Sequence, residues 1–157
     1  MAKWRVPMFK LSQRSFQRLV GVHPKLVDTV KLAIQKSDTD FGVIFGVRDL
    51  ATQEKLYKSG KSQTMKSKHL IQEDGYSHAV DLMAYDSGEP SWDIVDYDNI
   101  ADAMKAAALE TGVKIRWGAA WQINDFRDWE GTAEEAMNAY IDLRRSQGRR
   151  PFIDGPH

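Results

Sequence analysis

The sequence has no cysteine among its 157 residues. Disulfide bonds, thiolate metal sites and a cysteine nucleophile are therefore excluded, and any bound metal must take nitrogen and oxygen ligands. A G-x-S-x-G motif is also missing, so the chain offers no serine nucleophile of that type. These absences leave metal-assisted hydrolysis as the simplest route to hydrolytic chemistry.

A net charge is absent as well, since 22 basic residues balance 22 acidic ones. This gives no global electrostatic argument for nucleic-acid binding. No apolar stretch approaches the roughly 18 residues that a membrane span requires. Residues 1–15 lack the continuous apolar run of a signal peptide, so we expect a protein that is made in the cytosol and stays there unless something releases it.

The remaining composition is that of a globular protein, with 42% hydrophobic residues and a length that suits one domain over residues 1–157. Periodicity and capping signals predict four helices and three strands. The helices are expected at 24–36, 49–59, 98–111 and 132–145, and the strands at 41–47, 79–85 and 113–117. In the helix at 49–59, Leu50 and Leu56 are expected to face the interior.

Residues 122–150 differ from the rest, being polar and aromatic before a helix that begins with a capping box at Thr132 and Glu135. We interpret about 122–150 as a helical insertion within the single domain. Its basic residues are typical of a solvated helix end, and contact with an anionic polymer is the alternative. These residues are Arg144, Arg145, Arg149 and Arg150.

Asp81 is the most informative single residue, because it is one carboxylate within an otherwise apolar strand. A buried carboxylate needs a counter-charge or a metal ion. Two histidines and one carboxylate, here His69, Asp81 and His157, suit Zn²⁺ with a fourth position left for water. His23 is more typical of a helix cap.

Two further residues are candidates for a catalytic or substrate-binding role. Asp154 lies three residues before His157, and a turn at Gly155-Pro156 allows both side chains to face one ion, so Asp154 is a candidate general base. Arg48 follows a buried strand directly. It could stabilise an oxyanion or hold a substrate carboxylate, or it could form an ordinary ion pair.

These pieces resemble a known signature. Ser67-Lys68-His69, a following glycine, Ala79-Val80-Asp81 and Asp154-x-Pro156-His157 are similar to the S-x-H … G-x-A-x-D … D-x-P-H pattern of LAS-type zinc peptidases, the D-alanyl-D-alanine carboxypeptidase-like superfamily. Within it, the chain looks most like phage endolysins of the L-alanyl-D-glutamate endopeptidase type.

The resemblance implies an α+β, LAS/hedgehog-like zinc peptidase fold, with a small antiparallel sheet flanked by helices. By matched positions, His69, Asp81 and His157 would bind one Zn²⁺, Asp154 would be the general base, and Arg48 would contact the substrate. The implied reaction is hydrolysis of the L-Ala–D-Glu bond of peptidoglycan stem peptides. A D,D-carboxypeptidase or dipeptidase of the same fold is the alternative, as is a catalytically impaired wall-binding module.

The same resemblance implies a setting. The endolysin would act as a monomer on peptidoglycan, bind no nucleic acid, and move from the host cytoplasm to the periplasm and cell wall after holin action.

One departure from the pattern concerns the loop between His69 and Asp81, which is longer than usual. The place of the family glycine could be taken by Gly75 or by Ser77. His78 is interpreted as a structural or supporting residue. The sequence leaves open how His157, at its very end, is held in position.

Overall fold

A three-stranded antiparallel sheet in the order β1-β2-β3 lies at the centre of the computed structural model, which describes residues 9–157. Its strands are β1 (Asp40–Phe45), β2 (Asp81–Asp86) and β3 (Glu89–Ser91). The predicted α+β fold with a small antiparallel sheet is confirmed. The prediction that the N-terminus is not a signal peptide concerns mainly residues 1–8, which lie outside the described range.

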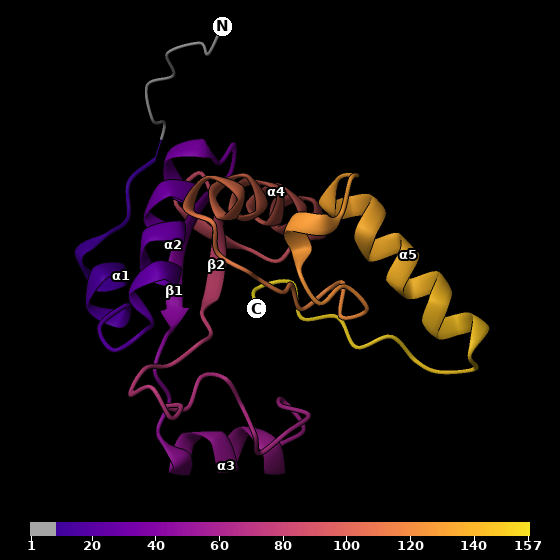
Figure 1. The fold of residues 1–157 in the computed structure, drawn as a ribbon, viewed down its shortest axis with the longest axis horizontal. Coiled ribbons are helices and arrows are strands. Elements are labelled where there is room, and N and C mark those ends of the chain that lie inside the picture. The colour runs from indigo at the N-terminus through magenta and orange to yellow at the C-terminus, as the bar shows by residue number, and fades with distance from the viewer. Residues whose placement is uncertain (1–8) are drawn as a thin grey trace, which may run out of the picture.

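Five α-helices are present over residues 9–157, and α2 and α4 pack on each other beside the sheet (Figure 1). The helix α3 and the loop after it stand apart from this body, on the side where β1 ends and β2 begins. The helices are α1 (Gln13–Arg18), α2 (Pro24–Lys36), α3 (Leu50–Lys58), α4 (Ile94–Thr111) and α5 (Ala133–Ser146), with a 3₁₀ turn at Phe126–Asp128.

Side-chain caps set the starts of the predicted helices. The Nδ1 of His23 accepts from the amide of Lys25, which confirms the prediction that His23 caps α2. Asp49 accepts from the Thr52 amide at the start of α3. Thr132 and Glu135 form the predicted capping box of α5. Each cap satisfies amides that a helix start leaves without partners.

The prediction that Leu50 faces the interior is wrong, because its side chain is 63% exposed. The buried side chain of α3 is instead Gln53, which is fully inaccessible to solvent. The reason is that α3 extends away from the main hydrophobic core, as Figure 1 shows. Its inward face therefore packs on the polar loop that follows it, and a hydrogen-bonding side chain fits there better than leucine.

Three other elements differ from prediction. The helix α4 begins at Ile94, four residues early, because Asp93 caps it. Residues 113–117 form no strand: they have no regular secondary structure and make isolated backbone hydrogen bonds, such as Phe126 N to Ile115 O. The short elements α1 and β3 were not predicted, since six and three residues carry too little periodicity.

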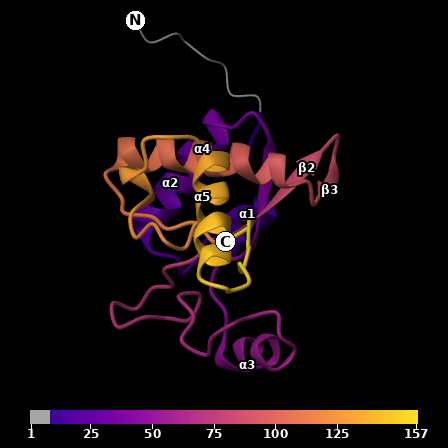
Figure 2. The same cartoon turned by 90° about the vertical axis from the view of Figure 1, so that its right-hand side faces the viewer.

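Residues 122–150 close a second hydrophobic cluster against α4. In Figure 2, α5 crosses in front of α4. Phe126, together with Ala133 and Ala136 of α5, is fully buried in this cluster. This segment therefore packs on α4 through a cluster of its own, beside the main core. None of the helices in residues 9–157 is both long and apolar enough to cross a membrane.

Candidate metal centre

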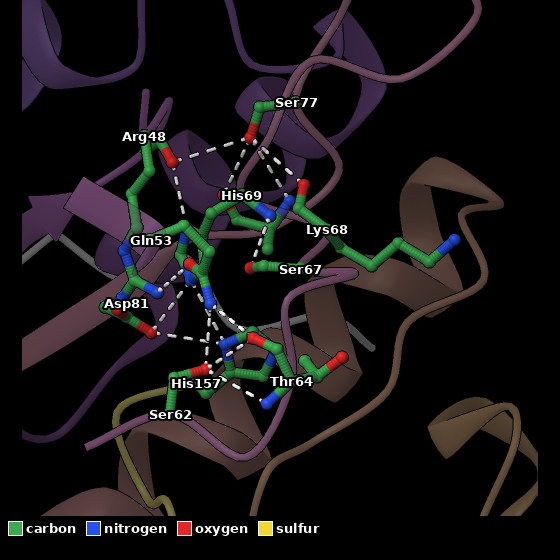
Figure 3. Close-up of polar contacts among 12 residues, drawn as sticks. Arg48, Gln53, Ser62, Thr64, Ser67, Lys68, His69, Ser77, Asp81 and His157 are labelled. Carbon is green, nitrogen blue, oxygen red and sulfur yellow. Dashed lines mark hydrogen bonds and ion pairs between the residues drawn. The ribbon is translucent and has the colours of Figure 1, made fainter. Parts of the chain in front are cut away.

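Three side chains that are distant in sequence converge where the central strand β2 begins (Figure 3). His69 comes from the loop after α3, Asp81 opens β2, and His157 arrives on the C-terminal segment. The Nε2 of His69, the Oδ1 of Asp81 and the Nδ1 of His157 lie 3.2 Å from one another in each of the three pairs. We call these three residues the candidate ligand cluster.

The spacing within the candidate ligand cluster fits a metal ion. A tetrahedral zinc with bonds of about 2.0–2.1 Å separates its ligand atoms by about 3.3 Å. Three atoms with lone pairs at such distances repel one another unless a proton or a cation lies among them. The cluster therefore matches one triangular face of a zinc tetrahedron.

A backbone carbonyl fixes the orientation of His69. Its Nδ1–H donates to the carbonyl oxygen of Gly46 at 2.8 Å, which leaves the Nε2 lone pair directed at the candidate ligand cluster. The amide of His69 also donates to Ser67 Oγ at 3.1 Å, and the imidazole is 1% exposed. Bonds of this kind to the far nitrogen are what hold metal-binding histidines in one tautomer.

Asp81 is buried, at 7% exposure, and its two oxygens have different partners. Oδ1 faces the two imidazoles, and Oδ2 forms an ion pair with Arg48 Nη2. Burial alone would raise the pKa of Asp81, but hydrogen bonds and positive charge from His157 and His69 outweigh it and hold the pKa well below its usual range. The carboxylate is thus ionised and ready to bind a cation.

Arg48 does not extend into open solvent, because its guanidinium is held on several sides. Besides the ion pair with Asp81, Nη1 donates to Gln53 Oε1 at 3.2 Å, and the group lies over the ring of Phe45. Its Nε–H is buried and has no hydrogen-bond partner among residues 9–157. Arg48 therefore joins the strand end to the carboxylate of the cluster.

Gln53 links this arginine to the loop after α3, a role that the sequence did not reveal. Its Nε2 donates to Ser62 Oγ at 2.8 Å and to the carbonyl of Thr64 at 2.7 Å (Figure 3). The available signal was a polar residue three positions after Leu50, on the face of α3 where an apolar residue was expected. Gln53 thus connects the 62–64 loop, through Arg48, to Asp81.

The C-terminal segment is held by hydrogen bonds along its length. The Pro156 carbonyl accepts from the amide of Leu82 at 2.9 Å, beside Asp81, and Trp117 Nε1 donates to the Gly155 carbonyl at 2.8 Å. The ring of His157 packs on Trp121, with centroids 5.4 Å apart. These contacts show how His157 is held, which the sequence had left open.

Asp154 lies on the same segment, next to the candidate ligand cluster. Burial raises its pKa and the negative charge of Asp81 adds to the effect, against the opposing charges of His157 and Arg48. A carboxylate whose pKa lies above its usual range accepts a proton more readily near neutral pH. The environment of Asp154 therefore suits a proton acceptor.

The loop of residues 70–78 separates the other histidines from the cluster. His78 Nε2–H donates to Asp74 Oδ2 at 2.7 Å, and the ring packs edge-on against His23. Gly75, with a φ of 85°, forms the tip of this loop. Ser77 is fully buried four residues before Asp81, which is the spacing of the glycine in the signature.

A cleft of about 600 Å³ has His157 in its lining, whereas His69 and Asp81 do not line it. Many of its lining residues are apolar or aromatic, and Gly155 and Pro156 of the C-terminal segment also line it. The apolar and aromatic lining residues include Leu82, Ile100, Met104, Trp117, Trp121 and Phe126. His157 thus stands between the candidate metal centre and a space large enough for part of a peptide.

Comparison with known proteins identifies the family of the chain. Residues 7–143 match the family described as phage L-alanyl-D-glutamate peptidase. The L-alanyl-D-glutamate peptidase of Escherichia phage T5 is 30% identical over 125 residues, which are 76% of this chain and 88% of that protein.

Among solved structures, the L-Ala D-Glu endopeptidase ChiX of Serratia marcescens is 36% identical and superposes with a TM-score of 0.66, covering 80% of this chain and 96% of that one. The family match includes Arg48, His69 and Asp81 but stops before Asp154 and His157. The argument for His157 is its contact with Asp81, and the argument for Asp154 is the burial and charge around its carboxyl group. On the match over most of its length, this chain belongs to the phage L-alanyl-D-glutamate peptidase family.

Proposed function

We propose that the protein is a zinc-dependent endolysin that hydrolyses the L-Ala–D-Glu bond of peptidoglycan stem peptides. Family membership supports the reaction and the substrate. The single observation that carries the zinc dependence is the 3.2 Å triangle of His69 Nε2, Asp81 Oδ1 and His157 Nδ1. These three residues would hold the ion.

A zinc ion at this place would supply a Lewis acid and lower the pKa of water to about 7. The proton released from the attacking water would pass to Asp154, whose raised pKa makes it a better acceptor than an ordinary aspartate. Asp154 would then return the proton to the amine of D-Glu as the amide bond breaks. The proton balance of hydrolysis is thereby complete without a covalent intermediate.

Arg48 is proposed to contact the substrate or its transition state. What supports this is its place beside Asp81 and an Nε–H without a partner in the described part of the chain. Its present bond to Asp81 also orients that carboxylate, so one side chain would serve the metal and the reacting carbonyl.

The setting of the reaction follows from the substrate. We propose that the chain is a monomeric catalytic domain over residues 1–157, with 122–150 as a helical insertion. It would accumulate in the host cytoplasm and reach the wall after holin action, and the exposed basic residues at the end of α5 could contact the anionic envelope.

The test combines metal content, lysis and product analysis. Purified protein should bind one zinc per chain, lyse walls, and release fragments with a new N-terminal D-Glu in mass spectra. Asp154→Asn should keep the zinc and lose at least about a hundredfold in rate, the scale of a missing general base. Loss of terminal D-Ala alone would instead identify a D,D-carboxypeptidase. Zinc-loaded Asp154→Asn with full activity would refute the general-base role.

A further inference from the structure

The cleft beside His157 has a one-sided distribution of charge. Four of its lining residues are lysine or arginine, and among the described residues that line it none is aspartate or glutamate. The chain as a whole has equal numbers of both signs, so the cleft concentrates positive charge that the composition does not predict. The basic residues are Lys25, Lys68, Lys114 and Arg116. Such a cleft favours an anionic ligand.

Lys68 is the basic residue most firmly tied to the candidate metal centre. It directly precedes His69, its carbonyl accepts from the His78 amide at 2.7 Å, and its side chain extends away from Asp81 and Arg48 (Figure 3). Within residues 9–157 its ammonium forms no ion pair. Arg116, by contrast, already donates to the carbonyl of Trp121. Lys68 thus offers an unpaired charge on a fixed backbone at the border of cleft and cluster.

The substrate proposed above supplies a matching anion. D-glutamate has two carboxyl groups, and only one of them can enter the main-chain amide that continues the stem. The other is a free carboxylate on the amine side of the scissile bond. Arg48 bonds Asp81 and Gln53 and is assigned above to the reacting carbonyl, so a different cation would pair with this carboxylate.

We propose that the cleft beside His157 binds the D-Glu side of the substrate, and that Lys68 pairs with the free carboxylate of the D-Glu residue. This inference rests on the proposed function. It makes Lys68 a specificity-determining residue, with the lining residues Trp117 and Trp121 contacting the peptide that follows.

The first experiment uses two synthetic stem peptides, one with the free D-Glu carboxylate and one with a carboxamide there. The wild type should cleave the carboxylate peptide with about fivefold higher kcat/KM, the factor expected of a solvent-exposed charge pair. Lys68→Gln should lose this preference through KM, with kcat little changed. Lys58→Gln, an exposed lysine of α3 that pairs with Glu54, is the matched control and should keep it.

The outcomes separate the two proposals. A wild type that cleaves neither peptide refutes the proposed function. A wild type that cleaves both peptides equally, or a Lys68→Gln variant that retains the preference, refutes the role of Lys68 alone. An unchanged unfolding midpoint of Lys68→Gln shows that a lost preference is not a folding defect.

A binding measurement tests the same pair without turnover. Calorimetry on the zinc-loaded Asp154→Asn variant should give tighter binding of the carboxylate peptide, and the advantage should shrink with added salt and vanish with Lys68→Gln. Inorganic polyphosphate is the competing probe. If it binds more tightly than the peptide and its binding depends on Lys68, the cleft serves a phosphate polymer and the assignment is overturned.

Discussion

The amide of Gly118 donates to the carbonyl oxygen of His157 at 2.8 Å, and its own carbonyl accepts from the amide of Asp154 at 2.9 Å. This pair of bonds holds the candidate ligand and the candidate base on one short turn. A side chain at position 118 has no room, because a Cβ there would lie 2.3 Å from the Asp154 carbonyl oxygen and 3.0 Å from His157 Cβ.

Gly118→Ala is therefore expected to displace the C-terminal segment. Overpacking of this kind costs about 1–3 kcal/mol of unfolding free energy, and zinc affinity should fall at least about tenfold with the lost geometry. Isothermal titration with zinc and thermal unfolding measure the two effects. Val30→Ala, a fully buried truncation in α2, is the control that lowers stability and keeps zinc affinity. Native zinc affinity in Gly118→Ala would contradict the prediction.

Metal removal should lower the thermal stability of the wild type. A ligand that binds only the folded chain stabilises it by about 4 kcal/mol at a thousandfold excess over Kd. Chelation should reduce Tm, and added zinc should restore it, by differential scanning calorimetry. His69→Ala lacks one corner of the triangle, so its Tm should not respond to zinc. A wild-type Tm that chelator leaves unchanged would argue against the site.

Arg48→Lys should weaken zinc binding about tenfold or more, although it retains the positive charge. The ammonium cannot bond Asp81 and Gln53 at the same time in the way the planar guanidinium does, so Asp81 loses its fixed orientation. Kinetics at saturating zinc then isolate the contact with the transition state, because any remaining loss appears in kcat. Unaltered zinc affinity together with unaltered kcat would exclude both roles.

Gln53→Leu should destabilise the protein by about 1–3 kcal/mol, despite similar volume, because the Nη1 donor of Arg48 loses its acceptor and the Thr64 carbonyl loses one of its two donors. The 62–64 loop should also become more susceptible to proteolysis. Urea unfolding and limited trypsin digestion check the two effects. Equal free energies of unfolding for variant and wild type would show that water replaces the hydrogen bonds of the Gln53 amide without loss of stability.

Asp98 predicts a pH-dependent stability that is independent of the metal centre. It is 5% exposed, and burial, with the nearby charges of Glu134 and Asp102, raises its pKa to about 6 from 3.8. Between about pH 4 and about pH 6, Asp98 keeps its proton in the folded chain and loses it in the unfolded chain. The free energy of unfolding therefore falls as pH rises through this interval and stays lower above it.

Asp98→Asn cannot ionise and should remove that loss. Its Tm should exceed that of the wild type at pH 7.5, and the difference should disappear near pH 4. Thermal unfolding of chelated protein across this range provides the measurement. A gain of equal size at every pH would mean that ionisation of Asp98 is not its cause.

Local signals in the sequence were sufficient for much of the fold. His23 and the Thr132–Glu135 capping box mark helix starts through bonds that span two or three residues, and the structure confirms both. Asp81 was identified as chemically unusual because a carboxylate in an apolar strand needs a partner. Local sequence failed at α1, β3 and residues 113–117, where short segments depend on what they pack against.

The sequence by itself determined the candidate metal ligands, general base and substrate contact. Residue type, spacing and resemblance were enough to identify His69, Asp81, His157, Asp154 and Arg48. Only the tertiary structure decided how they meet. Hydrogen bonds between distant segments orient the site: His69 bonds Gly46, Arg48 bonds Gln53 and Asp81, and Gly118 bonds His157. The four basic residues that line the cleft beside His157 also come from separate parts of the chain. Such contacts join chain segments with no shared periodicity, so their physical cause is packing of the whole domain and not any local pattern.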